Sequence, residues 1–384
     1  MRRRAISFIV LMGVVSLLSD ITYEGARSIT GPFLASLSAP AAAVGFVAGF
    51  GELVGYGFRL FSGIIADRTG RYWTITFLGY AINLLAVPAL ALAGHWPSAA
   101  ALMIAERFGK SLRAPARDAL LSRATSHVGH GWGFGLHEAM DQIGAVTGPL
   151  IVAFVLHGRG DFRESFAWLL IPALLALATL ALARVLDARG GGLTAAKPLP
   201  AAKGQKRAMW IYLAGVALVA AATADFPLIA YHFEKTSLMD RTTVPLLYAT
   251  AMGVDALSAL VFGRMFDRHG LGVLALPTAL AAFFAPLVFG GTMAGAIAGV
   301  ALWGLGMGAQ ESILRAAVAT LAPGEKRGAA YGLFSTVYGL AWFAGSAAMG
   351  LMYDWSIPAL TALCVCGQLA AVPLFYSLRR EALN

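Results

Sequence analysis

Long apolar runs recur along the whole chain, and short stretches that carry most of the charged residues separate them. A helix of about 20 apolar residues crosses the hydrocarbon core of a bilayer, and the runs are too continuous for the alternating strands of an outer-membrane barrel. Only 13% of the 384 residues are charged, whereas 58% are hydrophobic. We therefore expect an all-α integral membrane protein. The expected spans lie near 6–36, 41–65, 73–94, 98–120, 133–157, 166–186, 209–233, 243–263, 271–290, 294–320, 329–352 and 357–377.

The basic residues indicate how the chain is oriented in the membrane. With the N-terminus placed in the cytoplasm, most of the 29 Lys and Arg residues fall in cytoplasmic loops or helix ends, as the positive-inside rule predicts. The formal charge of +9 therefore reflects topology, and we expect no nucleic-acid partner. Asp20 and Glu24 stand where a signal peptide would be cleaved, so the first apolar run is expected to remain as a helix. We expect a multi-pass monomer in the lipid bilayer of the inner (plasma) membrane, with both termini cytoplasmic.

The chain divides into two similar halves. The longest hydrophilic stretch, 188–208, has the Gly, Pro and Lys content of a cytoplasmic linker, with six expected spans before it (1–187) and six after it (209–384). The segment GIIADRTGR returns as GRMFDRHGL, so Asp67 and Asp267 lie 200 residues apart. Two like halves are the architecture of many secondary transporters, which bind their substrate between the halves.

The first copy of this segment resembles the G-x-x-x-D-R-x-G-R loop of the major facilitator superfamily. The resemblance implies twelve transmembrane helices in two pseudo-symmetric six-helix bundles, and secondary active transport by alternating access. It also implies a gate, because in that family the loop aspartate accepts hydrogen bonds from helix N-termini when the cytoplasmic side is shut. The residues assigned to this gate are Gly63, Asp67, Arg68, Gly70, Arg71, Arg113, Asp267 and Arg268.

The fifth expected span is similar to the G-x-x-x-G-P motif of the antiporter branch of the family. Gly144, Gly148 and Pro149 supply it, and small residues at this spacing allow a neighbouring helix to approach closely. The fourth span carries Arg107 where that branch has R-x-x-x-G, but Ser111 replaces the glycine. The branch also has two later glycines that this chain lacks, so the direction of transport stays open.

Carboxylates outnumber basic side chains at membrane depth. Away from the ends of the expected spans lie nine Asp and Glu residues and six Arg and Lys residues, and an unpaired carboxylate in lipid avoids its desolvation cost by taking up a proton. The favoured carrier is Asp141, which follows His137 by one helical turn and precedes the glycines of the fifth span. The candidates for proton coupling are Asp141, Asp20, Asp225, Glu24, Glu138 and His137.

Charged and aromatic residues on cavity-lining spans are the candidates for substrate binding. In the fold that the resemblance implies, the first, fourth, seventh and tenth helices line the cavity, and several of these residues lie on them. The candidates are Tyr23, Arg27, Glu52, Glu106, Lys110, Asp255, Glu311 and Arg315.

These features favour a transporter that exports a small organic, amphipathic or cationic solute, uses the proton gradient as its energy source, and needs neither cofactor nor catalytic residues. An importer of an organic anion or a metal chelate is the alternative, in which Arg27, Arg59 and Lys110 would clamp the anion. An intramembrane metal-dependent hydrolase is more remote, because HEAMD has Asp141 where H-E-x-x-H has its second histidine. No metal site is expected. A non-transporting receptor is the last alternative.

Overall fold

The computed structural model describes residues 2–125, 130–189, 206–321 and 327–381, and within these ranges every regular element is helical. The helices of the first half are α1 (Arg2–Ser36), α2 (Ala41–Thr69), α3 (Tyr72–Ala89), α4 (Trp96–Thr125), α5 (His130–Arg159), α6 (Phe162–Trp168) and α7 (Leu170–Arg189). Those of the second half are α8 (Lys206–Ala221), α9 (Phe226–Thr236), α10 (Thr243–His269), α11 (Ala275–Ala281), α12 (Phe284–Val288), α13 (Met293–Ala309), α14 (Arg315–Leu321), α15 (Arg327–Trp355) and α16 (Ile357–Glu381).

Helices occupy all twelve positions expected from the sequence. Among the described residues, ten helical segments are long and apolar enough to cross a membrane. The other two positions hold α4, with 30 residues, and α15, with 29 residues, which are as long. Of the two, α4 contributes several charged side chains to the space between the bundles described below, and α15 contributes Tyr338 and Trp342. The expected linker, 188–208, falls mostly outside the described residues, so that boundary stays a prediction.

Two of the helical positions have a gap of two or more residues one turn before a proline. Between α8 and α9 the chain leaves the helix at 222–225, ahead of Pro227, and between α11 and α12 it does so at 282–283, ahead of Pro286. Proline has no amide hydrogen to donate to the carbonyl four residues earlier, so the helix loses a bond there. The seventh and ninth expected spans therefore each contain more than one helix.

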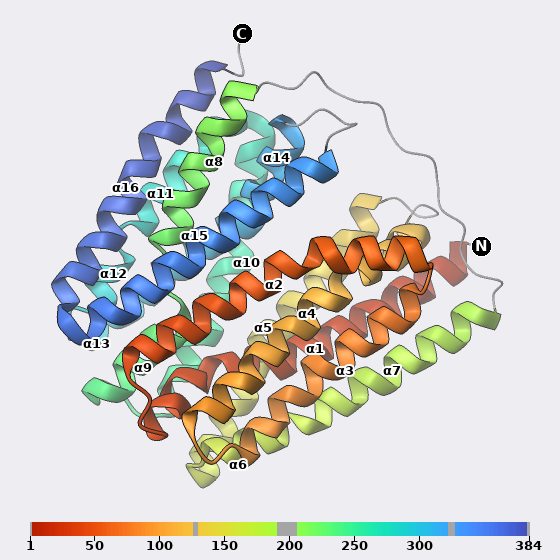
Figure 1. Cartoon of the computed structure of the whole chain (residues 1–384), viewed down its shortest axis with the longest axis horizontal. Helices are drawn as coiled ribbons and strands as arrows, with labels where there is room; N and C mark the ends of the chain where they lie inside the picture. Colours follow the sequence, from red (N-terminus) through yellow and green to blue (C-terminus); the bar gives the residue numbers. More distant parts are fainter. Residues whose placement is uncertain (1, 126–129, 190–205, 322–326, 382–384) are drawn as a thin grey trace.

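Two bundles of helices lie side by side (Figure 1). In the first bundle α1 packs on α5 and α7, and α4 packs on α2 and α3; in the second, α10 packs on α13, and α8 packs on α15 and α16. The most extensive contacts between the bundles are those of α2 with α15, α1 with α9, and α5 with α10, and α2 also contacts α9 and α1 also contacts α10. Residues far apart in the sequence thus meet along a single interface, where the candidate site lies.

The bundles are in close contact at one end of the interface. A Cβ atom built on Gly45 of α2 would lie only 2.8 Å from Gly350 Cα of α15. Further along the same helices, a Cβ on Gly332 of α15 would meet no heavy atom within 4 Å, and one on Gly63 of α2 would meet only Pro115 of its own bundle, so neither glycine packs against the opposite bundle. Since α1 begins and α16 ends at this second end (Figure 1), we call it the open end, and we call the other the closed end.

The two motif glycines of α5 lie where this helix packs against α1. A Cβ atom on Gly144 would stand 2.8 Å from Asp20 Cβ, and one on Gly148 would stand 2.8 Å from the Gly25 nitrogen. Real Cβ atoms do not approach backbone atoms so closely. Pro149 follows inside the same helix and is buried. The close approach of α1 and α5 therefore depends on the absence of side chains at Gly144 and Gly148.

Gly148→Ala is expected to lower the free energy of unfolding by about 1–3 kcal/mol, because the added methyl group overpacks the contact with α1. Helix propensity alone would make the alanine variant more stable by about 1 kcal/mol. A loss of stability would therefore come from the packing of the added methyl group. The measurement is the melting temperature of the purified protein in detergent. The matched control is Gly158→Ala in the same helix, where a Cβ would meet nothing within 4 Å. Equal melting temperatures for the two variants would contradict the packing role of Gly148.

Candidate functional site

A cavity with an empty volume of about 1290 Å³ lies between the two bundles, and we call it the central cavity. Its walls come from α1, α2, α4 and α5 on one side and from α10, α13, α14, α15 and the turn before α14 on the other. It reaches toward the open end, where the Asp118 side chain is 50% exposed. The charged residues that line it are Asp20, Glu24, Arg27, Glu52, Arg59, Arg107, Lys110, Arg113, Arg117, Asp118, Asp141, Asp255, Glu311 and Arg315.

A second cavity, of about 510 Å³, lies further toward the closed end, and we call it the closed-end cavity. Thr30 near the end of α1, Leu90 just after α3 and Pro227 at the start of α9 line it. Four residues line both cavities and so form the boundary between them. They are Tyr23, Arg27, Glu52 and Arg107.

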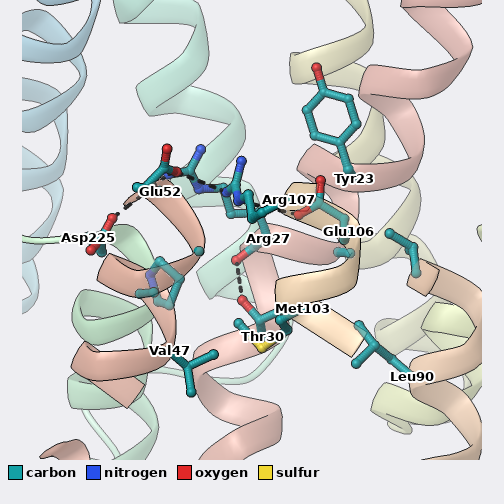
Figure 2. A pocket seen from close by; sticks show the side chains of 15 residues that line it. Tyr23, Arg27, Thr30, Val47, Glu52, Leu90, Met103, Glu106, Arg107 and Asp225 are labelled. Atoms are coloured by element: carbon teal, nitrogen blue, oxygen red, sulfur yellow. Dashed lines mark hydrogen bonds and ion pairs between the residues drawn. The ribbon is translucent and has the colours of Figure 1, made fainter. Parts of the chain in front are cut away.

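Ion pairs fill this boundary (Figure 2). Glu52 Oε1 lies 3.1 Å from Arg27 Nη2 and 3.2 Å from Arg107 Nη2, so one carboxylate joins two guanidinium groups. Arg107 Nε lies 3.3 Å from Glu106 Oε2, and Arg27 Nη1 lies 3.9 Å from Glu24 Oε1. We call Glu24, Arg27, Glu52, Glu106 and Arg107 the charge network. It links α1, α2 and α4 across the floor of the central cavity.

Two side chains that the sequence did not single out hold carboxylates of the charge network in place. Asn83 of α3, which is fully buried, donates through Nδ2 to Glu106 Oε1 at 2.7 Å and to the Glu106 carbonyl oxygen at 3.1 Å. Tyr248 of α10 donates its hydroxyl to Glu24 Oε2, and this hydrogen bond crosses from the second bundle to the first. An isolated buried asparagine or tyrosine gives no sequence signal for such a role, because its partner lies far away in the chain.

Asp225 lies at the interruption between α8 and α9 and faces the charge network. Its Oδ1 accepts a hydrogen bond from Trp342 Nε1 at 2.8 Å, and its Oδ2 accepts one from the Ser346 hydroxyl. Oδ1 also lies 4.0 Å from Arg27 Nη2, which belongs to the other bundle. The interruption itself is stabilised by Trp303, whose Nε1 donates to the Ala224 carbonyl oxygen at 2.8 Å. Asp225 thus connects the broken helix of one bundle with the ion pairs of the other.

Asp141 and His137 form a separate pair on α5. His137 Nδ1 lies 3.4 Å from Asp141 Oδ2, the histidine is 5% exposed and the carboxylate is 19% exposed to the central cavity. Asp20, on α1, accepts a hydrogen bond from Tyr23. The Glu138 side chain lies outside those that the structure describes. Asp141 therefore lines the same cavity as members of the charge network, but its ion pair is with His137 and not with a member of that network.

The residues assigned to the gate lie in two places. Arg68 and Gly70 are exposed at the turn between α2 and α3 at the open end, and Gly70 has a φ of 64°, a left-handed conformation that glycine adopts without strain. Arg113 instead is 1% exposed in the cavity wall, and its guanidinium lies 4.2 Å from the centre of the Tyr80 ring. The side chains of Asp67 and Asp267 lie outside those described. The remaining members of this set, Gly63, Arg71 and Arg268, lie on α2, at the start of α3 and on α10.

The substrate candidates from both halves line one or other cavity. Tyr23 and Lys110 face each other in the central cavity, with Lys110 Nζ 4.1 Å from the centre of the Tyr23 ring. Asp255, Glu311 and Arg315 line its other wall. Glu311 belongs to a π-helical turn, Gln310–Leu314, and such turns are frequent at functional sites.

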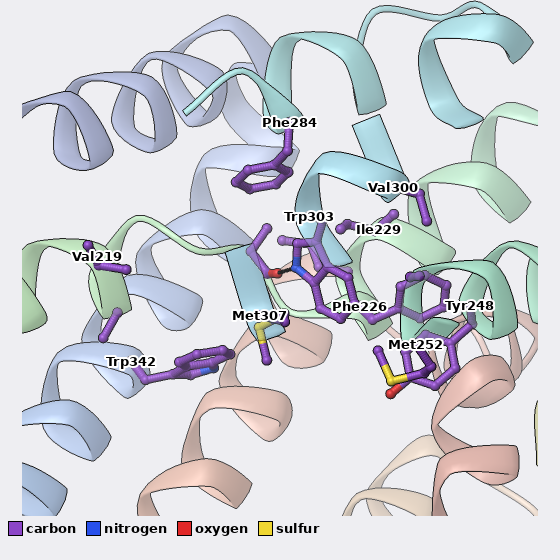
Figure 3. Close-up of a cluster of buried hydrophobic side chains, with 14 of the residues drawn as sticks. Val219, Phe226, Ile229, Tyr248, Met252, Phe284, Val300, Trp303, Met307 and Trp342 are labelled. Carbon is purple, nitrogen blue, oxygen red and sulfur yellow. Dashed lines mark hydrogen bonds between the residues drawn. The ribbon is translucent and has the colours of Figure 1, made fainter. Parts of the chain in front are cut away.

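Aromatic side chains form much of the wall that the second bundle contributes. Tyr248, Trp303, Tyr338 and Trp342 line the central cavity, together with Met252 and Met307. We call the four aromatic residues the aromatic wall. Behind it, Phe226 packs against Tyr248 and Trp303, with ring centres 4.3 Å and 5.6 Å apart (Figure 3). The wall from the first bundle is therefore mainly charged, and the wall from the second bundle combines aromatic side chains with Asp255, Glu311 and Arg315.

A family model described as Major Facilitator Superfamily matches residues 6–346 and 211–383. The chain belongs to the major facilitator superfamily. It is therefore a membrane transporter with the fold of this superfamily, it is not an enzyme, and transporters of this kind need no cofactor.

Relatives and solved structures agree with this assignment. An uncharacterised protein of Mycobacterium tuberculosis is 39% identical over 97% of this chain and 93% of its own length. An MFS-type transporter of Methanocaldococcus jannaschii, also uncharacterised, is 28% identical over 45% of this chain and 42% of its own. Two crystal structures share the fold. The nucleoside transporter NupG has a TM-score of 0.74 and 14% identity, with 97% of this chain and 98% of that chain covered. The peptide transporter POT with sulfate has a TM-score of 0.77 and 15% identity, with 98% of this chain and 94% of that chain covered.

Proposed function

We propose that this member of the superfamily exports small amphipathic or cationic organic solutes in exchange for protons. The observation that carries the proposal is the imbalance of charge where the bundles meet. Around Arg27, Arg107 and Lys110 lie four carboxylates, namely those of Glu24, Glu52, Glu106 and Asp225, so acidic groups outnumber basic groups by one. Excess negative charge at membrane depth is costly, and either a proton or a cationic group would relieve it. A proton and a cationic solute would therefore compete for one place, which is what an antiporter requires.

Asp225 is our proposed proton carrier, in preference to Asp141. Asp225 is 1% exposed, lies in a helix interruption and reaches Arg27 of the opposite bundle, so a change in its charge acts directly on the contact between the bundles. Asp141 is partly exposed to the central cavity and already has a partner in His137 on its own helix. Broken helices are also where many transporters bind ions and substrates. Asp20, Glu24, Glu138 and His137 are the less favoured candidates.

We further propose that the open end is cytoplasmic and that the monomer works in the plasma (inner) membrane. The exposed basic residues Arg68, Arg71 and Arg268 lie at helix ends, as the positive-inside rule predicts for the cytoplasmic side. With this orientation the central cavity takes up its solute from the cytoplasm.

The function is tested by measuring solute flux in proteoliposomes with an imposed pH gradient. The probe is ethidium, a planar aromatic cation whose charge suits the carboxylates and whose rings suit the aromatic wall. Ethidium should accumulate on the acidic side in proteoliposomes and not in protein-free vesicles, and an ionophore that collapses the gradient should abolish the accumulation. Ethidium flux equal to that of protein-free vesicles would count against an exporter of such cations.

Uptake of an organic anion is the second candidate, because basic residues are numerous in the wider part of the central cavity. Arg59, Lys110, Arg113, Arg117 and Arg315 all line it. Benzoate in the same assay distinguishes the two functions. Movement of benzoate together with protons, without movement of ethidium, would favour the anion importer.

A further inference from the structure

Arg113 of α4 is a buried basic residue in the wall of the central cavity. It is 1% exposed, and among the described residues it forms no ion pair, whereas Arg107 and Arg117 of the same helix each pair with a carboxylate. Its Nε atom is buried and has no hydrogen-bond acceptor in the described part of the chain. Buried charges are normally paired and hydrogen-bonded. An acidic group that enters the cavity would supply the missing partner.

Two tyrosine rings fix the position of the Arg113 guanidinium. Its central carbon lies 4.2 Å from the centre of the Tyr80 ring and 5.8 Å from the centre of the Tyr23 ring. A ring face attracts a cation and so offsets part of the cost of burying it, but the ring carries no negative charge. The guanidinium is therefore held in place without being neutralised.

The carboxylates in this part of the central cavity have other partners. Asp20 accepts a hydrogen bond from Tyr23, and Lys110 is the basic group that acts on it most strongly. The other two pairs here are Asp118 with Arg117 and Asp141 with His137. Arg113 thus adds one positive charge to this wall, whereas the charge network, together with Asp225 and Lys110, has one carboxylate in excess.

The central cavity has room for a small solute between these two places. About 200 Å³ of it can hold the centres of water molecules, and a single water molecule needs only about 10–15 Å³ by this measure. Arg107 of the charge network and Arg113 are six residues apart on α4. This spacing corresponds to about 9 Å along the helix axis.

We infer that Arg113 binds the carboxylate group of the transported solute, whose positive group lies about 9 Å away at the charge network. The solute is therefore a zwitterion with separated charges. Its carboxylate neutralises Arg113 and supplies an acceptor for Nε, in the charge-assisted geometry that arginine and carboxylate groups favour. Its positive group balances the excess carboxylate. This inference rests on the proposed function and specifies the substrate class.

The test compares 6-aminohexanoate with hexylamine and hexanoate, which each lack one of its charged groups, by equilibrium dialysis against the purified full chain. We expect 6-aminohexanoate to bind about tenfold more tightly than either. Arg113→Gln should weaken 6-aminohexanoate binding by about tenfold and leave hexylamine binding unchanged. The matched control is Arg184→Gln on α7, which removes the same charge at an exposed position outside the cavity and should bind as the unmodified protein does.

Melting temperatures separate a binding role of Arg113 from a structural one. Because its charge has no carboxylate partner among the described residues, Arg113→Gln should not lower the melting temperature. Added 6-aminohexanoate should raise the melting temperature of the unmodified protein and not that of the variant. Arg113→Lys is the second variant if the first does not fold. It keeps the charge but loses the planar fork, so 6-aminohexanoate binding should weaken severalfold while hexylamine binding stays unchanged.

The outcomes distinguish this inference from the proposed function. Unchanged 6-aminohexanoate affinity in folded Arg113→Gln or Arg113→Lys would overturn the inference, even if ethidium flux supports the function. Hexylamine binding as tight as that of 6-aminohexanoate would overturn it too. If hexanoate binds as tightly as 6-aminohexanoate and both depend on Arg113, the carboxylate site is retained and the place for a positive group is rejected.

Discussion

Asp225→Asn is expected to abolish accumulation of ethidium against its gradient while exchange down the gradient continues. Asparagine keeps the shape of the side chain and mimics a permanently protonated carboxyl group, so the site can no longer load and release a proton. With the asparagine carbonyl oxygen at the Oδ1 position, Trp342 can still donate to it and the Ser346 hydroxyl can accept from the amide nitrogen, which should keep the interruption between α8 and α9 intact. The measurement is ethidium flux in proteoliposomes with and without a pH gradient, and gradient-driven accumulation should fall to the level without a gradient.

Asp118→Asn is the matched control for this experiment. Asp118 also lines the central cavity, but it is 50% exposed and pairs with its neighbour Arg117 at 2.8 Å. Its substitution should leave coupling unchanged. If Asp141→Asn uncouples transport and Asp225→Asn does not, the proton is carried on α5, as the sequence first suggested. If both variants remain coupled, the proton site lies at neither residue.

Glu52→Gln is expected to lower the free energy of unfolding by about 3 kcal/mol, since it breaks the shortest buried ion pairs of both Arg27 and Arg107 and leaves Arg27 only carboxylates about 4 Å away. The effect falls on two residues at once, because Glu52 bridges Arg27 and Arg107. Glutamine can accept a hydrogen bond but carries no charge. The measurement is the melting temperature in detergent, and the double variant Glu52→Gln/Arg107→Gln should be more stable than the sum of its single changes predicts.

Glu234→Gln serves as the control for charge removal at the surface. Glu234 pairs with Arg241 at 2.8 Å, and the Arg241 side chain is 51% exposed. Such a pair contributes about 1 kcal/mol or less. A loss of stability in Glu52→Gln no larger than that in Glu234→Gln would show that the charge network does not hold the bundle together.

The sequence already determined the class of protein and the positions of its helices. Apolar runs can be recognised one by one, because each helix satisfies its own backbone hydrogen bonds and needs no partner to be identified. The repeated loop around Asp67 and Asp267 is likewise a local pattern, and it indicated two similar halves before any contact between them was known. The glycines at 144 and 148 were recognised for the same reason, since their spacing alone places them on one face of a helix.

Only the tertiary structure decided which charges meet. Glu52 was a candidate from its depth alone, but its bridge between Arg27 and Arg107 joins three helices, and no local pattern specifies such a pairing. The interruption before Pro227 depends on distant donors in the same way, because Trp303 comes from α13 and Trp342 comes from α15. A buried ion pair or a broken helix is stable only when distant groups arrive in the right place. The sequence could therefore supply the charged residues of this transporter, and packing of the helices determined how they are connected.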